Sequence, residues 1–159
     1  MSYHRIPLTS SRARAGHQGG ELEPLRAARV TCTALELISI DRTRTVTALQ
    51  QGIGCRHFDV LSLPGDLDFY VDDEGAINGS PLNLPLTIIA HILGTPAVLF
   101  GTAIALGCNP DTGDSTSLTD QQLAALTTAA SSTPTPDVLD RLTISLAPLP
   151  HIIDMLRTL

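Results

Sequence analysis

The longest apolar stretch of the chain, residues 84–106, is interrupted too often to form one continuous element. The interruptions are Pro85, His91, Gly94, Pro96 and Gly101. A helix that crosses a membrane needs about 20 consecutive, predominantly apolar residues, so no membrane contact is expected. The stretch is instead predicted to form two buried elements joined by a turn. The first is a short helix that begins at Asn83 or Pro85 and ends at Gly94, and the second is a strand that follows Pro96.

This predicted strand has one bulky face and one flat face. The bulky face carries Val98, Phe100, Ile104 and Leu106, and the flat face carries Ala97, Leu99, Gly101, Ala103 and Ala105. A flat face allows a helix to pack closely on the strand. A helix is predicted further along, over residues 120–130. Thr119 and Gln122 have the spacing of a capping box at its start, and Leu118 and Leu123 can form a hydrophobic staple.

The preceding residues predict further strands and one more helix. Residues 30–40 show a strand pattern with one slip of register. A helix capped by Asp41 or Thr43 should follow, because Val46, Leu49 and Ile53 lie at helical spacing and Gly52 and Gly54 mark its end.

A hairpin is predicted next, from a strand over residues 56–63 and a second over 67–72, joined by the turn sequence Leu63-Pro64-Gly65-Asp66. In the second strand apolar residues alternate with Asp68, Tyr70 and Asp72, which predicts a half-buried strand with these polar residues outside. Gly75, in the acidic turn that follows, is suited to a positive φ.

Together these elements predict an α+β fold: a mostly antiparallel sheet of four to five strands, with two to three helices packed mainly on one face. The chain divides into a flexible, arginine-bearing arm over residues 1–23, a single domain over 28–131 and a C-terminal tail over 132–159. The tail contains a proline-rich linker at 133–136, a candidate strand at 142–146 and a short helix from Pro150. It should dock on its own domain or exchange with a second copy, so a homo-oligomer through this tail is one possibility.

Composition excludes several classes of function. All ten basic residues are arginine, which rules out a Schiff-base lysine and a phosphate-loop lysine. The aromatic content of 3% leaves few rings for base stacking, and the net charge of −6 makes nucleic acid an unlikely partner. Three widely spaced cysteines and the absence of an apolar leader favour a reduced, cytoplasmic protein, in the host cell cytoplasm if a phage encodes it.

No catalytic or metal-binding motif is complete. Asp66, Asp68, Asp72, Asp73 and Glu74 cluster within nine positions, but their spacing does not fit a calcium loop, and a solvated hairpin rim is the preferred interpretation. The soft ligands Cys55, His57, His91 and Cys108 lack a paired zinc motif. His57 and Asp59 lack an evident nucleophile nearby. We therefore predict no catalytic residue, no metal site and no cofactor.

Several short motifs resemble the family known as domain of unknown function 3846. They are Tyr70-Val71-Asp72-Asp73-Glu74-Gly75, Leu82-Asn83, Gly101-Thr102-Ala103, Gly113-Asp114 and Ser117-Leu118-Thr119-Asp120-Gln121-Gln122-Leu123. The resemblance covers residues 35–126. It implies an accessory protein of a bacterial plasmid, prophage or phage, and it brings no known catalytic residue. The matching positions Asp72, Asp73, Asn78, Asn83, Gly101 and Thr102 are the candidate binding residues, with turns and close backbone packing as the competing interpretation.

Three hypotheses about function follow. The first is a non-enzymatic accessory binding protein of a phage or other mobile element, which engages a host factor or sequesters a small molecule in host–phage conflict. The second is a DNA-associated regulator that uses Arg5, Arg12 and Arg14 as an arm. The third is a metal-dependent enzyme that acts through the acidic hairpin rim.

Overall fold

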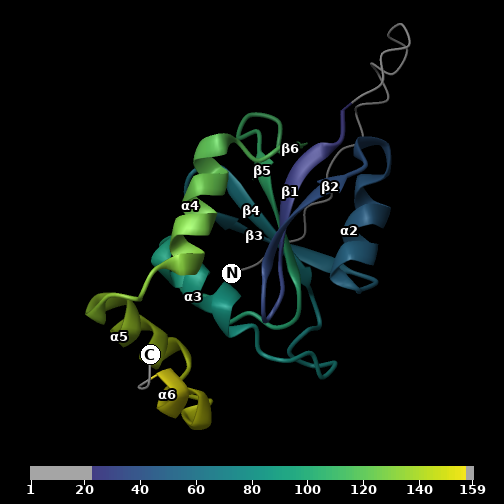
Figure 1. Cartoon of the computed structure of the whole chain (residues 1–159). Helices are drawn as coiled ribbons and strands as arrows, with labels where there is room; N and C mark the ends of the chain where they lie inside the picture. The colour runs from purple at the N-terminus through teal and green to yellow at the C-terminus, as the bar shows by residue number, and fades with distance from the viewer. Residues whose placement is uncertain (1–22, 157–159) are drawn as a thin grey trace, which may run out of the picture.

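The computed structural model describes residues 23–156 (Figure 1). The predicted arm, with its nucleic-acid candidates Arg5, Arg12 and Arg14, lies outside these residues apart from Glu23. The strands are β1 (Leu25–Val30), β2 (Leu35–Ile40), β3 (Phe58–Leu63), β4 (Leu67–Asp72), β5 (Ala103–Cys108) and β6 (Ser115–Thr116). The helices are α2 (Thr45–Ile53), α3 (Leu84–Ile92), α4 (Asp120–Ser131), α5 (Pro136–Ser145) and α6 (Pro150–Leu156), and a short 3-10 turn, η1 (Arg42–Arg44), precedes α2.

The strands form one six-stranded sheet in the order β2-β1-β5-β4-β3, with β6 paired to β5. Every pairing between strands is antiparallel. The predicted α+β class is therefore confirmed. The sheet has more strands than the predicted four to five for two reasons. A turn breaks the segment predicted as one strand over residues 30–40, so that β1 ends at Val30 and β2 begins at Leu35, and the short strand β6 pairs with β5.

A four-residue turn divides that segment. The Thr31 N–H donates to the Ala34 carbonyl over 2.9 Å, and the Thr31 hydroxyl accepts from the backbone N–H groups of Thr33 and Ala34. A threonine hydroxyl that captures the next N–H groups stabilises a turn in competition with an extended strand. The slip of register in the sequence pattern lies at the end of this turn.

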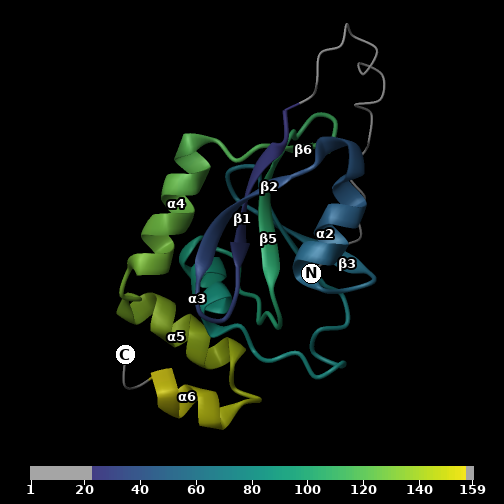
Figure 2. The same cartoon turned by 45° about the vertical axis from the view of Figure 1, so that its right-hand side comes forward.

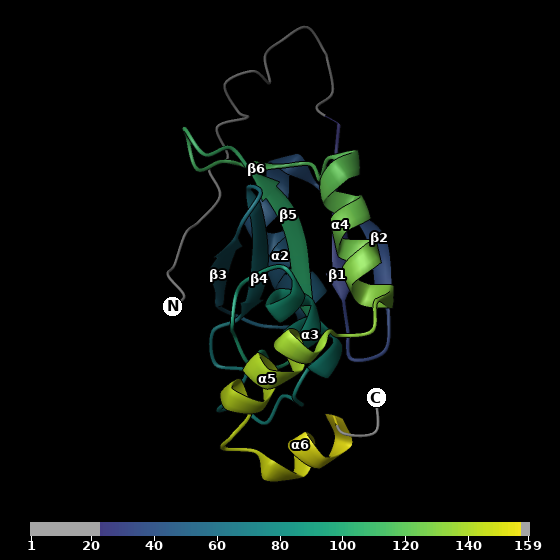
Figure 3. The same cartoon turned by 90° about the vertical axis from the view of Figure 1, so that its left-hand side faces the viewer.

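Helices cover both faces of the sheet, with α4 on one side and α2 on the other (Figures 1 and 3). On the α2 face a core forms from Leu49, Phe58, Val60, Tyr70, Ile104 and Leu106 with neighbours from β1 and β2. On the opposite face β-strand residues pack with Leu86, Ile89 and Ala90 of α3 and Leu126 and Ala129 of α4. Within residues 23–156, α3 and α4 thus share one face of the sheet, and α2 covers the other.

Because of α2, strand β4 is buried on both faces and the expectation of a half-buried strand is wrong. Tyr70 is fully buried, and its ring meets Phe58 edge to face at a centroid distance of 5.5 Å. Asp68, predicted on the outer face, is only 1% exposed and accepts a hydrogen bond from the Ser62 hydroxyl over 2.9 Å.

Strand β5 is shorter than predicted because Gly101 adopts a φ of +78°. Residues before it do not continue the strand, although Phe100 forms an isolated bridge with Leu82. The flat face of β5 behaves as expected. Ala103 and Ala105 belong to the core under α3 and α4, whereas Ile104 and Leu106 belong to the core under α2.

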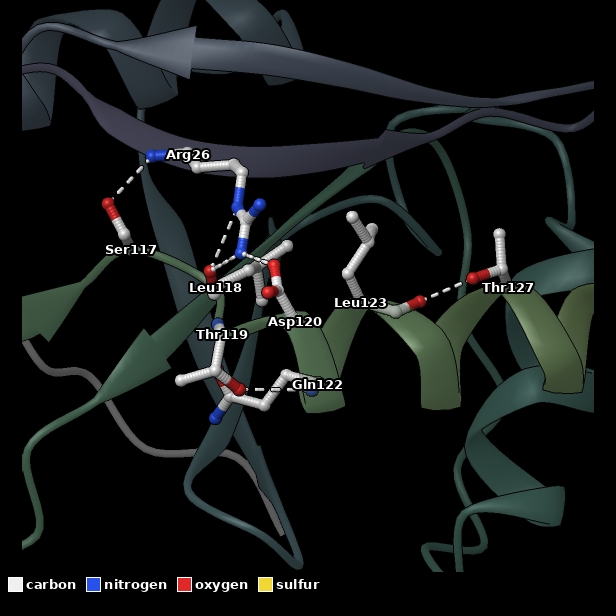
Figure 4. Close-up of polar contacts among 8 residues, drawn as sticks. All are labelled: Arg26, Ser117, Leu118, Thr119, Asp120, Gln122, Leu123 and Thr127. Carbon is white, nitrogen blue, oxygen red and sulfur yellow. Dashed lines mark hydrogen bonds and ion pairs between the residues drawn. The ribbon is translucent and has the colours of Figure 1, made fainter.

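The start of α4 is anchored by its own cap and by β1 (Figure 4). The Gln122 N–H donates to the Thr119 hydroxyl over 3.0 Å and the Thr119 N–H donates to Gln122 Oε1 over 2.9 Å, which completes the predicted capping box. The Arg26 guanidinium donates to the Leu118 carbonyl and pairs with Asp120 at 2.8 Å. Leu118 and Leu123 both join the core beneath the helix.

The C-terminal tail is helical and folds back below the sheet, next to α3 (Figure 2). The strand predicted at residues 142–146 is wrong, because this segment belongs to α5 and the turn that follows it. Pro136 is the first residue of α5, and the Thr135 hydroxyl accepts from the Val138 N–H over 3.3 Å as its N-cap. A third apolar core joins Val138, Leu142 and Leu146 to partly buried residues of α3 and its flanking loops.

Candidate functional site

Asn83 is fully buried and holds three elements together. Its Oδ1 accepts from the Leu86 N–H over 3.1 Å, which caps α3. Its Nδ2 donates to the Gly101 carbonyl over 2.8 Å and to the Val30 carbonyl over 3.1 Å. Both ends of the amide are occupied, so Asn83 joins α3 to the end of β1 and to the residues before β5 rather than facing a ligand.

Asp72, the last residue of β4, and Asn78, in the loop that follows, lie together. Asp72 Oδ1 accepts from the Glu74 N–H over 2.9 Å, and Asp72 Oδ2 accepts from Asn78 Nδ2 over 2.8 Å. Asn78 Oδ1 in turn accepts from the backbone N–H and hydroxyl of Ser80. The two side chains thus close the loop on itself and order it from residue 72 to residue 80.

Two glycines bring this loop against the residues before β5. Gly101 has a φ of +78°, which favours glycine, and its N–H donates to the Pro81 carbonyl over 2.8 Å. Gly75 does not have the positive φ expected from the sequence. It is needed because an added Cβ would lie 3.1 Å from the Phe100 carbonyl oxygen.

A cavity of about 600 Å³ lies between the end of α2 and this loop. Its lining includes Gln50, Cys55, Arg56, His57, Asp72, Asp73, Glu74 and Asn78. A smaller hollow of about 230 Å³ lies on the other side of the same carboxylates, lined by Asp72, Asp73 and the residues from Ala97 to Phe100. Of the six predicted binding residues, Asp72, Asp73 and Asn78 therefore border a cavity, whereas Asn83, Gly101 and Thr102 do not line either one.

The electrostatic environment of the larger cavity is negative. Its lining contains the three acidic residues Asp72, Asp73 and Glu74 and one basic residue, Arg56. Burial, together with the negative charges of Asp72 and Asp73, raises the pKa of Cys55 to about 11. A thiol with this pKa is protonated near neutral pH and is a poor nucleophile. The cavity is therefore suited to hydrogen-bond donors and positive charge rather than to covalent chemistry.

The acidic residues predicted as a hairpin rim do not form one cluster. Asp66 lies in the β3–β4 turn and Asp68 near the start of β4, whereas Asp72 is the last residue of β4 and Asp73 and Glu74 follow it. Of the soft ligands, Cys55 and His57 line the larger cavity, whereas His91 does not. His91 Nδ1 donates to the Thr87 carbonyl and Nε2 bonds the Ser145 hydroxyl, each over 2.8 Å. Within residues 23–156, no group of three or more His, Cys, Asp or Glu side chains is placed to hold a metal ion.

Sequence reasoning missed the α2 side of the cavity. Gln50 Nε2 donates to the Arg56 carbonyl over 2.7 Å, and Gly54 ends α2 with a φ of +83°. This left-handed cap turns the chain so that Cys55 and His57 reach the loop after β4. The sequence predicts that the helix ends at Gly54, but no local sequence pattern predicts the contact between this turn and residues 72–78.

Comparison with known proteins gives a family and no function. The family described as a domain of unknown function (DUF3846) matches residues 27–131, which span β2 to α4 and all but the start of β1. No curated protein and no solved structure matches the chain. Among the described residues, no helix is both long enough and apolar enough to cross a membrane.

Proposed function

Because the chain belongs to the DUF3846 family, whose description names no activity, we propose its function from the cavity: a non-enzymatic binding protein that holds a positively charged group beside Asp73 and Glu74. The observation that carries the proposal is the 600 Å³ cavity and its acidic lining. A volume in this range is typical of small-molecule sites. The setting in a phage or other mobile element stays a prediction from the resemblance.

The carboxylates of the cavity have different roles. Asp72 is committed to the loop through Glu74 and Asn78. Asp73 and Glu74 are exposed and line the same cavity, so they can accept from an ammonium or guanidinium group. Gln50 and His57 add polar groups from the α2 side. An amine-bearing small molecule and a basic side chain of a host protein offer the same chemistry here.

The absence of an activated nucleophile in the cavity supports binding without turnover. The Cys55 thiol is protonated at neutral pH because its pKa is raised to about 11. Asp72, which could otherwise act on a nearby group, is already hydrogen-bonded at both oxygens. Turnover of any bound ligand that depends on Asp73 or His57 would contradict the proposal.

The test is a titration of the full chain, followed by NMR and calorimetry. The probes are a short diamine and an arginine-containing tripeptide, which separate a small-molecule ligand from a protein-borne basic group. We expect amide shifts centred on residues 54–57 and 73–78. Asp73→Asn and Glu74→Gln should each weaken binding about two- to fivefold, as expected for exposed charge pairs.

Asp140→Asn is the matched control. Asp140 is an exposed carboxylate on α5, outside the cavity, so its neutralisation changes net charge equally without changing the site. If neither probe binds, or if Asp140→Asn weakens binding as much as Asp73→Asn, the cavity is not the binding site.

A further inference from the structure

Strand β2 lies at one edge of the sheet and, among the described residues, pairs only with β1. Its sequence, Leu-Glu-Leu-Ile-Ser-Ile, contains no proline, glycine or lysine and a single charge, Glu36. Exposed edge strands are usually protected against pairing by charges, prolines or bulges. That protection is minimal here, because the Glu36 carboxylate is paired with Arg29 on β1 at 3.1 Å.

The outward backbone groups of β2 can be identified from its partner strand. The Arg26 N–H donates to the Ser117 hydroxyl and its carbonyl accepts from the Leu118 N–H, so the polar groups of Arg26 face away from β2. Arg26 is opposite Ser39. Opposed residues of an antiparallel pair both face toward each other or both face away. Ser39, and by alternation Leu37 and Leu35, therefore present their N–H and C=O groups at the open edge.

Leu37 lies at the centre of these three residues and is 59% exposed. It is opposite Ala28, a residue of the core beneath α3 and α4. Leu35 packs partly against that core, whereas Leu37 extends beyond it. On the other face, Ile38 and Ile40 pack with the core under α2. The open edge thus carries one large apolar side chain on its α4 face, in the middle of the unpaired backbone groups.

We propose that β2 is a dimerisation edge, which pairs antiparallel with β2 of a second copy about a two-fold axis at Leu37. In this register Leu37 faces Leu37 of the second copy, and Leu35 faces Ser39. Each such facing pair exchanges two backbone hydrogen bonds. The outward groups of β2 are symmetric about Leu37, so the edge is complementary to itself, as an isologous interface requires.

Two factors favour this register over the registers shifted by two residues: the position of the Glu36 charge and the number of residues that pair. A shift by two residues in one direction places Glu36 opposite Glu36 of the second copy, and like charges directly opposite each other destabilise a pair of strands. A shift in the other direction removes Leu35 from the pairing. In the register centred on Leu37, Glu36 faces Ile38 and keeps Arg29 as its partner. Pairing at β2 is independent of the C-terminal tail, which packs on α3 of its own chain.

The test measures the mass of the full chain in solution by sedimentation and light scattering over a range of concentrations. We expect the wild-type chain to form a dimer. Leu37→Lys and Leu37→Glu should each weaken the dimer at least about tenfold, because they place like charges opposite each other and remove an apolar contact. An equimolar mixture of the two variants should restore the dimer, since Lys then faces Glu.

Ile144→Lys is the matched control, because Ile144 is 75% exposed on α5 and receives the same charge away from β2. Amide exchange on the wild-type chain tests the proposal independently of folding in the variants. Protection at Leu35, Leu37 and Ser39 should rise with concentration. A wild-type chain that stays monomeric at roughly 1 mM, where even an association of only about −4 kcal/mol would be half complete, would overturn the proposal. So would a dimer that survives Leu37→Lys, or a mixture that stays monomeric.

Discussion

At the scale of single residues, two side chains of the family motifs support the backbone around the cavity. Asn83 bonds three backbone groups, and Asp72 closes a loop with Asn78. The competing interpretation of these positions, turns and close packing, explains their contacts directly. Asp73 differs, because its exposed carboxylate lies between two hollows of the surface. The positions that match the family motifs therefore include both residues that support the backbone and residues whose side chains are available to a ligand.

Replacement of Asn83 should cost substantial stability. Asn83→Ala removes the α3 cap, worth about 1 kcal/mol, and leaves the Val30 and Gly101 carbonyls without their donor, at about 1–3 kcal/mol for a buried group. We expect the free energy of unfolding in urea to fall by about 2–4 kcal/mol. Asn109→Ala, in an exposed turn where the side chain caps only its own loop, is the control and should cost less. Equal losses for both variants would contradict the role given to Asn83.

Cys55 should make stability depend on alkaline pH. Its pKa is about 11 in the folded chain, against 9.0 for an unperturbed thiol. The folded state therefore favours the protonated thiol, and this contribution is complete below pH 9 and lost as pH rises through 11. The free energy of unfolding, measured by urea titration at a series of pH values, should decline between pH 9 and about 11. Cys55→Ser should reduce the decline, because serine does not titrate there.

The effect of the neighbouring carboxylates on the pKa of Cys55 can be tested by the kinetics of thiol alkylation. Asp73→Asn removes one of the negative charges that disfavour the thiolate, so the pKa of Cys55 should fall and its alkylation at pH 9 should be faster. Asp140→Asn should leave the rate unchanged. Peptide mapping separates Cys55 from Cys32, which is exposed, and Cys108. An unchanged rate in Asp73→Asn would show that the charge of Asp73 does not reach the thiol.

At the scale of elements, local signals predicted most helices and strands correctly, and the errors have physical causes. The capping box at Thr119 and the hairpin turn at 63–66 depend on adjacent residues, so the sequence contains them completely. The burial of Tyr70 depends on α2 lying over the second face of the sheet, and Asp68 lies beside Ser62 and the loop after β5. No local pattern encodes either environment. The segment at 142–146 alternates weakly enough to suggest a strand, but Thr135 and Pro136 start a helix that continues through it.

The candidate site was predictable only in part, for the same reason. Asp72, Asp73 and Asn78 were found because they lie within one short loop. Gln50 was not predicted, and Cys55 was considered only as a soft ligand, because these residues at and after the end of α2 meet that loop only in the folded chain.

Docking of α5 on α3 should depend on Leu142. Leu142 is fully buried in the third core, and loss of a buried leucine side chain costs about 2–5 kcal/mol. Leu142→Ala should therefore speed amide hydrogen exchange across residues 136–156, while exchange in β4 and β5 stays near the wild-type rate. Thr143→Ala, at an exposed position of the same helix, is the control. Equal acceleration in the sheet would mean that the tail and the sheet unfold together.

At the scale of the whole molecule, the fold separates three surfaces by location. The acidic cavity lies beside α2, the open edge of the sheet lies at β2, and the tail lies on α3. The proposed ligand site and the proposed dimer contact share no residue, so each can be removed without the other. Leu37→Lys should leave cation binding unchanged, and Asp73→Asn should leave the dimer unchanged. Loss of both properties in either variant would show that the two surfaces are coupled.

The position of α3 between two cores has a consequence for the history of the family. Leu86, Ile89 and Ala90 face the sheet, Ile92 contacts both cores, and Leu84 and Ile88 contact the tail. The family match ends at residue 131, before α5 begins. A relative that lacks the tail would expose the positions of Leu84 and Ile88 to water. Such relatives should carry polar residues there, and the tail and the apolar character of α3 should have been gained or lost together in evolution.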